Sequence, residues 1–408
     1  MLVIVLMMIG LTVFGGDKPR REKDAAGQWH VTHVNKFLDV ENLVLLAKDA
    51  SFIAIMAVGM TAVIVMGGID LSVGSIYALA ALVGAIFLRY NWAQGPPSVT
   101  FAGSALWPWA LAIGAVVLGG AGFGVTRAGQ SRGKLLLRAG GSSIYALAGV
   151  AALWAIGIVV VCLRDANTNA PELGLSGSLF VGVGSCCLVG ALCGLVNGAL
   201  VVGLNVHPFI ITLGTMAVLR GVAFVLTSGL PVSGFPDSFT SGFFKAQIQG
   251  VYPVPVMVMV AVAIAGAFVL RGTVLGRRTY AIGGNETAAR YAGVPVGRVK
   301  IIVYTLMGML AGLSACVYLG YLGAASSDAG QSYELSVIAA AVIGGASLSG
   351  GRGSAVGAVL GAILIQLINN AMIILDINTN YTNIVMGAAI VAAVVMDQAK
   401  SRLMPGAR

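Results

Sequence analysis

The chain has 408 residues and a formal net charge of +9, and 58% of its residues are hydrophobic whereas only 10% are charged. Soluble domains carry about 25% charged residues, so this composition excludes a soluble enzyme, a nucleic-acid-binding protein and a disordered chain. It leaves an all-α, polytopic membrane protein, in which basic residues collect in the cytosolic loops.

Apolar runs follow one another along the chain. The first, Met1 to Phe14, lacks a basic n-region and a small-residue cleavage site, so we expect a first span rather than a signal peptide. Together the runs predict a helical bundle of about 10–12 spans of about 20 residues each, forming a single transmembrane domain over 1–408. Several runs are too short or too rich in glycine to span simply, and we expect re-entrant breaks there. After the first, the runs are 43–66, 73–88, 105–125, 143–163, 177–203, 208–227, 251–270, 300–322, 334–347, 355–375 and 384–396.

The distribution of basic residues indicates the orientation of these spans. Arg and Lys gather in 126–142, in 271–300 and in the C-terminal tail, which we therefore predict to be cytosolic. The loops 164–176, 228–250 and 323–333 hold few basic residues and are predicted to be external. Counting spans then places 17–42 outside, although this polar segment is rich in Lys and Arg, and it is the one loop that conflicts with the rule.

The first glycine-rich break begins at Gly67 and Gly68. Asp70 and Ser72 follow, and the apolar run resumes at Val73. A carboxylate and free backbone groups are both costly in lipid, so such a break must be buried in protein, line a wet path or cap a helix. Two compatible interpretations remain, a cap provided by Asp70 or Ser72 for the next helix and an element of a translocation pathway.

The break has a counterpart late in the chain. The segment 67–74, GGIDLSVG, matches 344–351, GGASLSGG, at five of eight positions, and LVNGA at 195–199 resembles LINNA at 367–371. Because the order is the same, we interpret this similarity as a two-half internal repeat, which is common in transporters. Chance similarity among spans rich in glycine and leucine is the alternative.

Small and polar residues mark other helices. Glycines four residues apart predict close helix packing, at Gly190, Gly194 and Gly198 and at Gly353, Gly357 and Gly361. Three uncharged polar residues, Gln366, Asn369 and Asn370, lie within an apolar run and either line the pathway or hydrogen-bond across helices. The cysteines lie in apolar stretches, and the phosphate-loop pattern of ATPases is absent. We therefore expect no metal, no cofactor and no catalytic residue in this chain.

The segment 276–298 contains a predicted cytosolic helix of about two turns. Asn285 suits an N-cap, acidic Glu286 suits the first turn, and Gly293 ends the helix. These residues alone leave open whether the helix docks to a soluble partner or lies on anionic lipid. The segment comprises Asn285, Glu286, Thr287, Ala288, Ala289, Arg290, Tyr291, Ala292 and Gly293.

Four stretches together resemble the ribose-type ABC sugar permeases, the membrane subunits of bacterial binding-protein-dependent importers. They occur in the family's order and cover about 40–90 and 180–400. They are VMGGIDLSVGS at 65–75, HPFIITLGTM at 207–216 with Arg220-Gly221, the GGNE loop at 283–286, and 333–351 from YEL to the second glycine-rich break.

The resemblance implies a multi-pass subunit of the bacterial inner membrane that imports a monosaccharide and has no ATPase of its own. It implies three partners besides membrane lipid: an ATP-binding subunit, an external sugar-binding protein and a second permease copy, identical or not. It also implies that the helix 285–293 inserts into a cleft of the ATP-binding subunit and couples ATP-driven motion to the spans.

The chain departs from this family between about 105 and 176, where it has three expected spans instead of one. We interpret the additional pair as a two-helix insertion, either a peripheral packing hairpin or a regulatory surface. Two other functions remain open. One is a permease of the same superfamily for branched-chain amino acids or nucleosides, and the other is an ion-coupled carrier, for which Asp70 is the one plausible mid-membrane ionisable residue.

Overall fold

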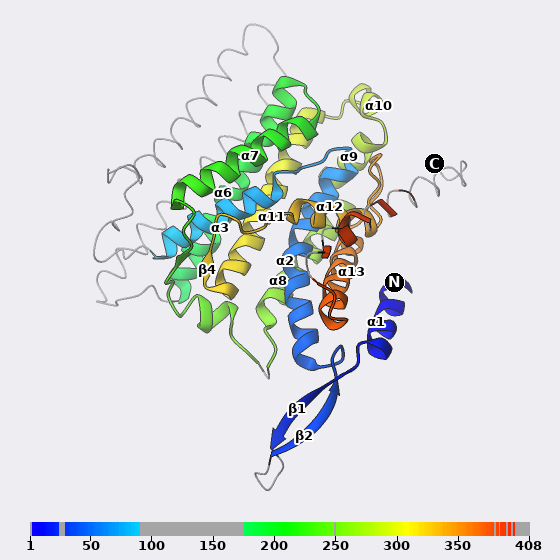
Figure 1. Ribbon diagram of the computed structural model, residues 1–408. Coiled ribbons are helices and arrows are strands. Elements are labelled where there is room, and N and C mark those ends of the chain that lie inside the picture. Colours follow the sequence, from blue (N-terminus) through cyan, green and yellow to red (C-terminus); the bar gives the residue numbers. More distant parts are fainter. Residues whose placement is uncertain are drawn as a thin grey trace.

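The computed structural model describes residues 2–23, 29–89, 175–248 and 250–378, together with short stretches between 381 and 395. The basic loop 126–142 lies outside this part of the chain. So does the predicted two-helix insertion at 105–176, except for its last residues. The described residues form a bundle of helices with a small hairpin at one end (Figure 1).

Six helices within the described residues are long and apolar enough to cross a membrane. Three further apolar helices are shorter: α1 (Leu2–Phe14), α3 (Val73–Arg89) and α12 (Tyr333–Ile343). All nine lie close to the apolar runs expected from the sequence, which confirms the all-α polytopic class. The six long helices are α2 (Val40–Val65), α6 (Leu175–Leu204), α7 (Pro208–Thr227), α8 (Pro253–Gly272), α11 (Val296–Leu322) and α13 (Ala355–Ile374).

Short elements connect these helices on two opposite sides (Figure 1). On the predicted cytosolic side, called the inner side here, α8 continues into α9 (Val274–Gly284) and α10 (Glu286–Tyr291). The other side, called the outer side, holds β1 (Asp17–Lys23), β2 (Trp29–Asn35) and the π-helical turn η1 (Thr240–Phe244). The two-residue strands β3 (Val232–Ser233) and β4 (Ala324–Ala325) pair between loops of this side.

The hairpin β1–β2 is an element that the sequence analysis expected only as a polar segment. Its strands pair antiparallel, with Asp17 opposite Asn35. Lys18 and Arg20 on β1 form ion pairs with Asp39, which is buried at the start of α2. The hydrogen bond from Lys18 lowers the pKa of Asp39 below its ordinary value. The basic residues that conflicted with the orientation rule thus include two that pair with one carboxylate at the end of a span.

Glycine stripes set the closest helix contacts, as predicted. A Cβ added at Gly190 on α6 would lie 2.1 Å from the carbonyl oxygen of Gly308 on α11, and one at Gly194 would lie 2.2 Å from the carbonyl oxygen of Tyr304. On α13, Gly361 faces the backbone of α12 in the same way. Gly353 does not share the stripe of α13, because it precedes that helix. Backbone-to-backbone contact of this kind needs a glycine at the point of contact, because a Cβ there would meet the facing carbonyl.

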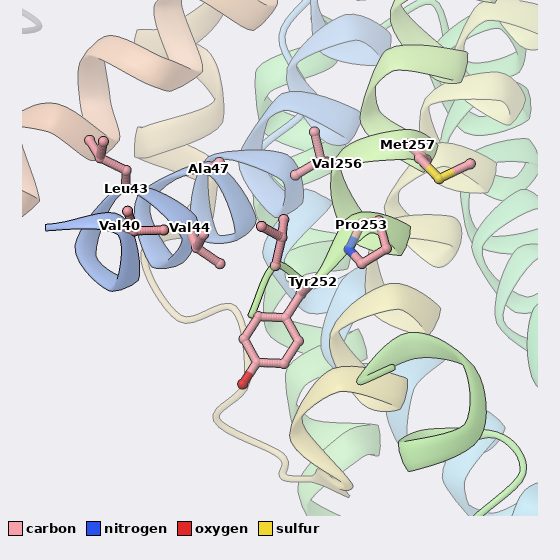
Figure 2. Close-up of a pocket in the computed structure, with 9 residues that line it drawn as sticks. Val40, Leu43, Val44, Ala47, Tyr252, Pro253, Val256 and Met257 are labelled. Carbon is pink, nitrogen blue, oxygen red and sulfur yellow. The ribbon is translucent and has the colours of Figure 1, made fainter. Parts of the chain in front are cut away.

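The centre of the bundle is α2, which is buried along most of its length. It packs against α8, α11, α12 and α13. In contrast, α7 and α8 expose large apolar side chains, such as Val218, Val225 and Phe268, as helices that face lipid do. An apolar hollow of about 410 Å³ lies between the outer ends of α2 and α8, and Figure 2 shows the Tyr252 hydroxyl pointing away from it.

Candidate functional site

The predicted inner-side helix is present as α10. The side-chain oxygen of Asn285 accepts a hydrogen bond of 2.9 Å from the backbone N–H of Ala288, which confirms Asn285 as the N-cap. Gly293 follows the helix with φ +80°, a left-handed conformation that glycine adopts without strain. Both ends of this short helix are therefore fixed by local residues.

One face of α10 packs against the rest of the protein, and the other face is exposed to solvent. Ala289 is buried, and Glu286 bonds to Arg290 at 3.1 Å and to Lys300 on α11 at 2.8 Å. Burial alone would raise the pKa of Glu286. Lys300 and Arg290 donate hydrogen bonds to its carboxylate and carry positive charge, and together they lower the pKa overall. The remaining residues of the predicted segment are exposed, namely Asn285, Thr287, Ala288, Arg290, Tyr291, Ala292 and Gly293.

α9 connects this exposed helix to the bundle. Gly283 packs so closely against the end of α2 that an added Cβ would lie 1.7 Å from the carbonyl oxygen of Val65. The same carbonyl accepts a hydrogen bond of 2.8 Å from Gly351, in the segment between α12 and α13. Three parts of the chain that are distant in sequence thus meet here: α9, the end of α2 that precedes the first break, and the second break.

The first break joins α2 to α3. Gly67 has φ +82°, and an added Cβ at Gly68 would lie 2.7 Å from the hydroxyl of Tyr304, so both positions require glycine. Asp70 is completely buried, and one of its carboxyl oxygens accepts bonds from the backbone N–H (2.9 Å) and the hydroxyl (2.6 Å) of Ser72. These bonds order the two residues that precede α3.

Other helices contribute polar groups to this break. Asn197 on α6 donates a bond of 2.7 Å to the Ser72 hydroxyl. The hydroxyls of Thr212 on α7 and Tyr304 on α11 each lie 3.4 Å from the carbonyl oxygen of Ile69. Sequence reasoning did not single out Asn197, Thr212 or Tyr304 as site residues. Their signal is a polar residue inside an apolar span, which gains meaning only when the helices are assembled.

Two oxygen atoms in this cluster stand out. The second carboxyl oxygen of Asp70 and the side-chain oxygen of Asn197 are buried and have no hydrogen-bond partner among the described residues. Buried polar atoms are almost always paired, because leaving one unpaired costs free energy. The break therefore contains two buried acceptors without a partner among the described residues.

The second break, between α12 and α13, ends its helix with the same geometry. Met66 and Gly344 are both right-handed C-caps, and the next residues, Gly67 and Gly345, both have positive φ. The backbone correspondence is thus shifted by one residue from the sequence match. Because this geometry is the general way in which helices end at glycine, the internal repeat stays a prediction.

An arginine holds the chain between α11 and α12. Arg220 on α7 donates bonds of 2.9 Å to the carbonyl oxygen of Ser327 and 2.8 Å to that of Ala329. Its other terminal nitrogen lies 3.5 Å from the carbonyl oxygen of Gly330. A charged guanidinium is tolerated within a span when backbone carbonyls satisfy it. Arg220 belongs to one of the resembling stretches but was not predicted as a site residue.

The polar residues of α13 lie elsewhere. Asn370 exchanges hydrogen bonds of 2.6 and 3.3 Å with Asn42 at the outer start of α2. Asn369 bonds to Gln366, one turn away on the same helix, at 3.4 Å. Of the two interpretations that the sequence left open, Asn370 therefore follows the cross-helix one. These residues are not brought together with Asp70, which follows the opposite end of α2.

Comparison with known proteins identifies the family. The family model described as "Branched-chain amino acid transport system / permease component" matches residues 135–394. The chain belongs to this permease family. It is therefore a transport subunit, and the six candidate spans among its described residues make it a multi-pass protein of the bacterial inner membrane.

Curated relatives of the permease include sugar-import proteins. The ribose import permease protein of Escherichia coli strain K12 is 33% identical over 366 residues, which cover 89% of this permease and 88% of the relative. The D-allose permease protein of the same strain is 42% identical over 53% of this permease and 65% of the relative. The galactose/methyl galactoside permease protein of Haemophilus influenzae is 32% identical, over 58% and 72% respectively. No solved structure matches the permease significantly.

Proposed function

We propose that this permease is the membrane subunit of an ATP-driven ABC importer for a monosaccharide. The single observation that carries the proposal is the 33% identity to a ribose import permease over 89% of the chain. The relatives named for allose and galactose support the same class of cargo. Alternating access would move the sugar: an external sugar-binding protein delivers it, and ATP hydrolysis on a separate subunit switches the pathway.

The proposal assigns α10 to the contact with the ATP-binding subunit. Its capped, solvent-exposed surface offers Tyr291, whose side chain is 88% exposed, as a docking residue. The ion pair between Glu286 and Lys300 connects α10 to α11, and Gly283 on α9 lies against the last residue of α2 and the second break. A displacement of α10 is thereby transmitted to the segments that bracket the buried polar cluster. A second permease copy completes the importer.

Uptake measurements test the proposal. Cells that express the permease with its neighbouring transport genes should accumulate at least one of D-ribose, D-allose and D-galactose, and inactivating the ATP-binding subunit should abolish uptake. Tyr291→Ala should lower both uptake and co-purification of the ATP-binding subunit. Leu322→Ala, which removes an exposed side chain at the outer end of α11, is the matched control and should change neither. Sugar uptake that persists without the ATP-binding subunit would contradict the proposal.

The description of the family model favours a second candidate cargo, a branched-chain amino acid. Adding leucine, isoleucine, valine and nucleosides to the same uptake panel separates these cargoes from sugars. The ion-coupled carrier is separated by its energy source, because a protonophore would stop it even when cellular ATP is maintained.

A further inference from the structure

The segment between α11 and α12 is buried on one face and exposed on the other. We call residues 326–332 the outer loop, because they connect the two helices on the outer side. Within the outer loop, Ser327 and Ala329 are each only 7% exposed, whereas Asp328 and Gln331 are exposed. The outer loop therefore covers the bundle as a lid does, with one side packed and the other side open to solvent.

The packed side of the outer loop lies against the start of α3. An added Cβ at Gly74, in the first turn of α3, would collide with the carbonyl oxygen of Gly330 and would lie 2.6 Å from a carboxyl oxygen of Glu334. The ring of Tyr77, one turn further along α3, also packs against Gly330. The buried polar cluster of the first break immediately precedes α3. The outer loop therefore packs on the helix that follows this cluster.

Arg220 on α7 holds the outer loop in this position. Its guanidinium donates hydrogen bonds of 2.9 and 2.8 Å to two backbone carbonyls of the loop, those of Ser327 and Ala329. The carboxylates of Asp328 and Glu334 lie within electrostatic range of the same guanidinium. A guanidinium serves several acceptors at fixed angles, whereas an ammonium is a single point charge. One side chain from a neighbouring span thus fixes the backbone of the outer loop at two positions.

The end of the outer loop is strained. Ser332 has φ +64°, a left-handed conformation that is unfavourable for a residue with a side chain. Ser332 directly precedes α12 and makes no side-chain capping bond there, although serine is among the best N-cap residues and caps from an extended conformation. A loop that leaves α3 would allow Ser332 to become extended and to cap α12. This relaxation offsets part of the cost of breaking the Arg220 bonds.

We propose that the outer loop is a lid that Arg220 holds closed, and that the loop leaves α3 when the permease opens to the outside. This inference rests on the proposed function, because alternating access requires an outward-open state. Two opposed effects set the equilibrium: the Arg220 bonds favour the closed loop, and the strain at Ser332 favours the open one. Such a balance lets a modest differential interaction shift the population between two states. Arg220 is thus a positioning residue for transport and does not need to touch the cargo.

Thiol labelling measures the position of the outer loop in the complete importer reconstituted in vesicles. Ser327→Cys places a thiol on the packed side, and a membrane-impermeant maleimide is added from the outer side. Gln331→Cys places a thiol on the exposed side of the same loop and reports access of the reagent. The parent without an added cysteine gives the background from the native cysteines. Labelling is compared at rest and during ATP hydrolysis with the binding protein and D-ribose, D-allose or D-galactose, whichever the wild-type importer transports.

We expect the thiol at position 327 to react slowly at rest and faster during ATP hydrolysis, while the thiol at position 331 reacts quickly throughout. Arg220→Gln should raise the resting rate at position 327 about tenfold. Arg220→Lys keeps the charge without the planar fork and should raise this rate less. Arg89→Gln, which alters an exposed arginine at the other end of α3, is the matched control and should change nothing.

Ser332→Gly tests the opposed effect. Glycine adopts the left-handed conformation without strain and offers no capping oxygen, so it favours the closed loop in both states. Labelling at position 327 during ATP hydrolysis should fall about threefold, and the rate of sugar uptake should fall with it. Loss of the fold would expose the buried thiol and accelerate labelling, so a misfolded variant cannot produce this result.

A resting rate at position 327 that stays unchanged in Arg220→Gln would overturn the role of Arg220. A rate that does not increase during ATP hydrolysis in the wild-type importer would show that the outer loop does not open. If the wild-type importer transports none of the three sugars, the proposed function itself fails. The resting comparison between the wild type and Arg220→Gln needs no cargo and still decides whether Arg220 holds the outer loop closed.

Discussion

The phenol of Tyr280 on α9 donates a hydrogen bond of 2.6 Å to the carbonyl oxygen of Gly353, in the segment that precedes α13. This bond joins the inner-side helices to the second break, while the adjacent Gly283 contacts the end of α2. The inner-side helix α9 is thus bonded to the second break and packs against the last residue of α2, just before the first break. The first prediction concerns this bond.

Replacing Tyr280 by phenylalanine removes this hydrogen bond and keeps the ring. We expect the free energy of unfolding to fall by about 1 kcal/mol, the usual contribution of one hydrogen bond, and the number of sugars transported per ATP to fall as well. Both are measured in vesicles, together with Tyr381→Phe, which alters an exposed tyrosine, as the control. Full coupling in Tyr280→Phe would show that the bond transmits no motion.

The neighbouring glycines Gly283 and Gly284 offer a matched pair. A Cβ at Gly283 would overlap the carbonyl oxygen of Val65, whereas a Cβ at Gly284 meets nothing within 4 Å. Gly283→Ala must displace backbone and should destabilise the protein by about 1–3 kcal/mol. Gly284→Ala should be neutral or slightly stabilising, because alanine favours the helix. Thermal unfolding of the two variants checks this difference, and equal melting temperatures would contradict the packing.

The N-cap of α10 can be tested by two substitutions of one residue. Asn285→Ala removes the acceptor for the Ala288 N–H and should cost about 1 kcal/mol of helix stability. Asn285→Asp keeps an acceptor at the same place and should behave like wild type. The affinity for the ATP-binding subunit, measured by co-purification at graded concentrations, should fall only in the alanine variant.

The pairing of Glu286 predicts a pH dependence. Its pKa is lowered from the ordinary value of 4.5, so the folded state favours the ionised carboxylate. This stabilisation is fully present above that ordinary value and is lost as pH falls through the lowered one. Glu286→Gln should therefore melt at a lower temperature than wild type at pH 7. The difference should shrink progressively below about pH 4.5, and a difference that grows on acidification would exclude this role.

Asp70 distinguishes a structural carboxyl from an ion-coupling one. Asp70→Asn keeps an oxygen that accepts from Ser72 and replaces the unpartnered oxygen by a donor, so stability should equal or exceed that of wild type. Asp70→Ala leaves the Ser72 N–H and hydroxyl unpaired and should cost about 1–3 kcal/mol. Thermal unfolding measures both effects. Uptake should persist in Asp70→Asn, and its complete loss in a stable variant would favour the ion-coupled carrier.

Local chemistry explains what the sequence predicted well. Spans such as α7 and α13 follow from long apolar runs, because lipid demands them. α10 follows from Asn285 and Gly293, since capping depends on neighbouring residues only. The approach of α6 to α11 follows from Gly190 and Gly194 for the same reason: small residues on one face permit it whatever the partner.

The remaining features depend on residues that only the fold brings together. Asn197 and Ser72 are separated by 125 positions in the chain, and no pattern around either one identifies the other. The hairpin β1–β2 was missed because charged residues such as Lys18 and Arg20 resemble a loop until Asp39 pairs with them.

The contact between α6 and α11 limits how the permease can move. Gly190 on α6 meets the backbone of Gly308, and Gly312 on α11 meets the carbonyl of Cys186, so the two backbones touch at these positions with no side chain between them. We therefore expect α6 and α11 to move together as one rigid unit. A transport cycle is then expected to bend elsewhere, at the joints 66–72 and 344–354, where the helical hydrogen bonding is interrupted.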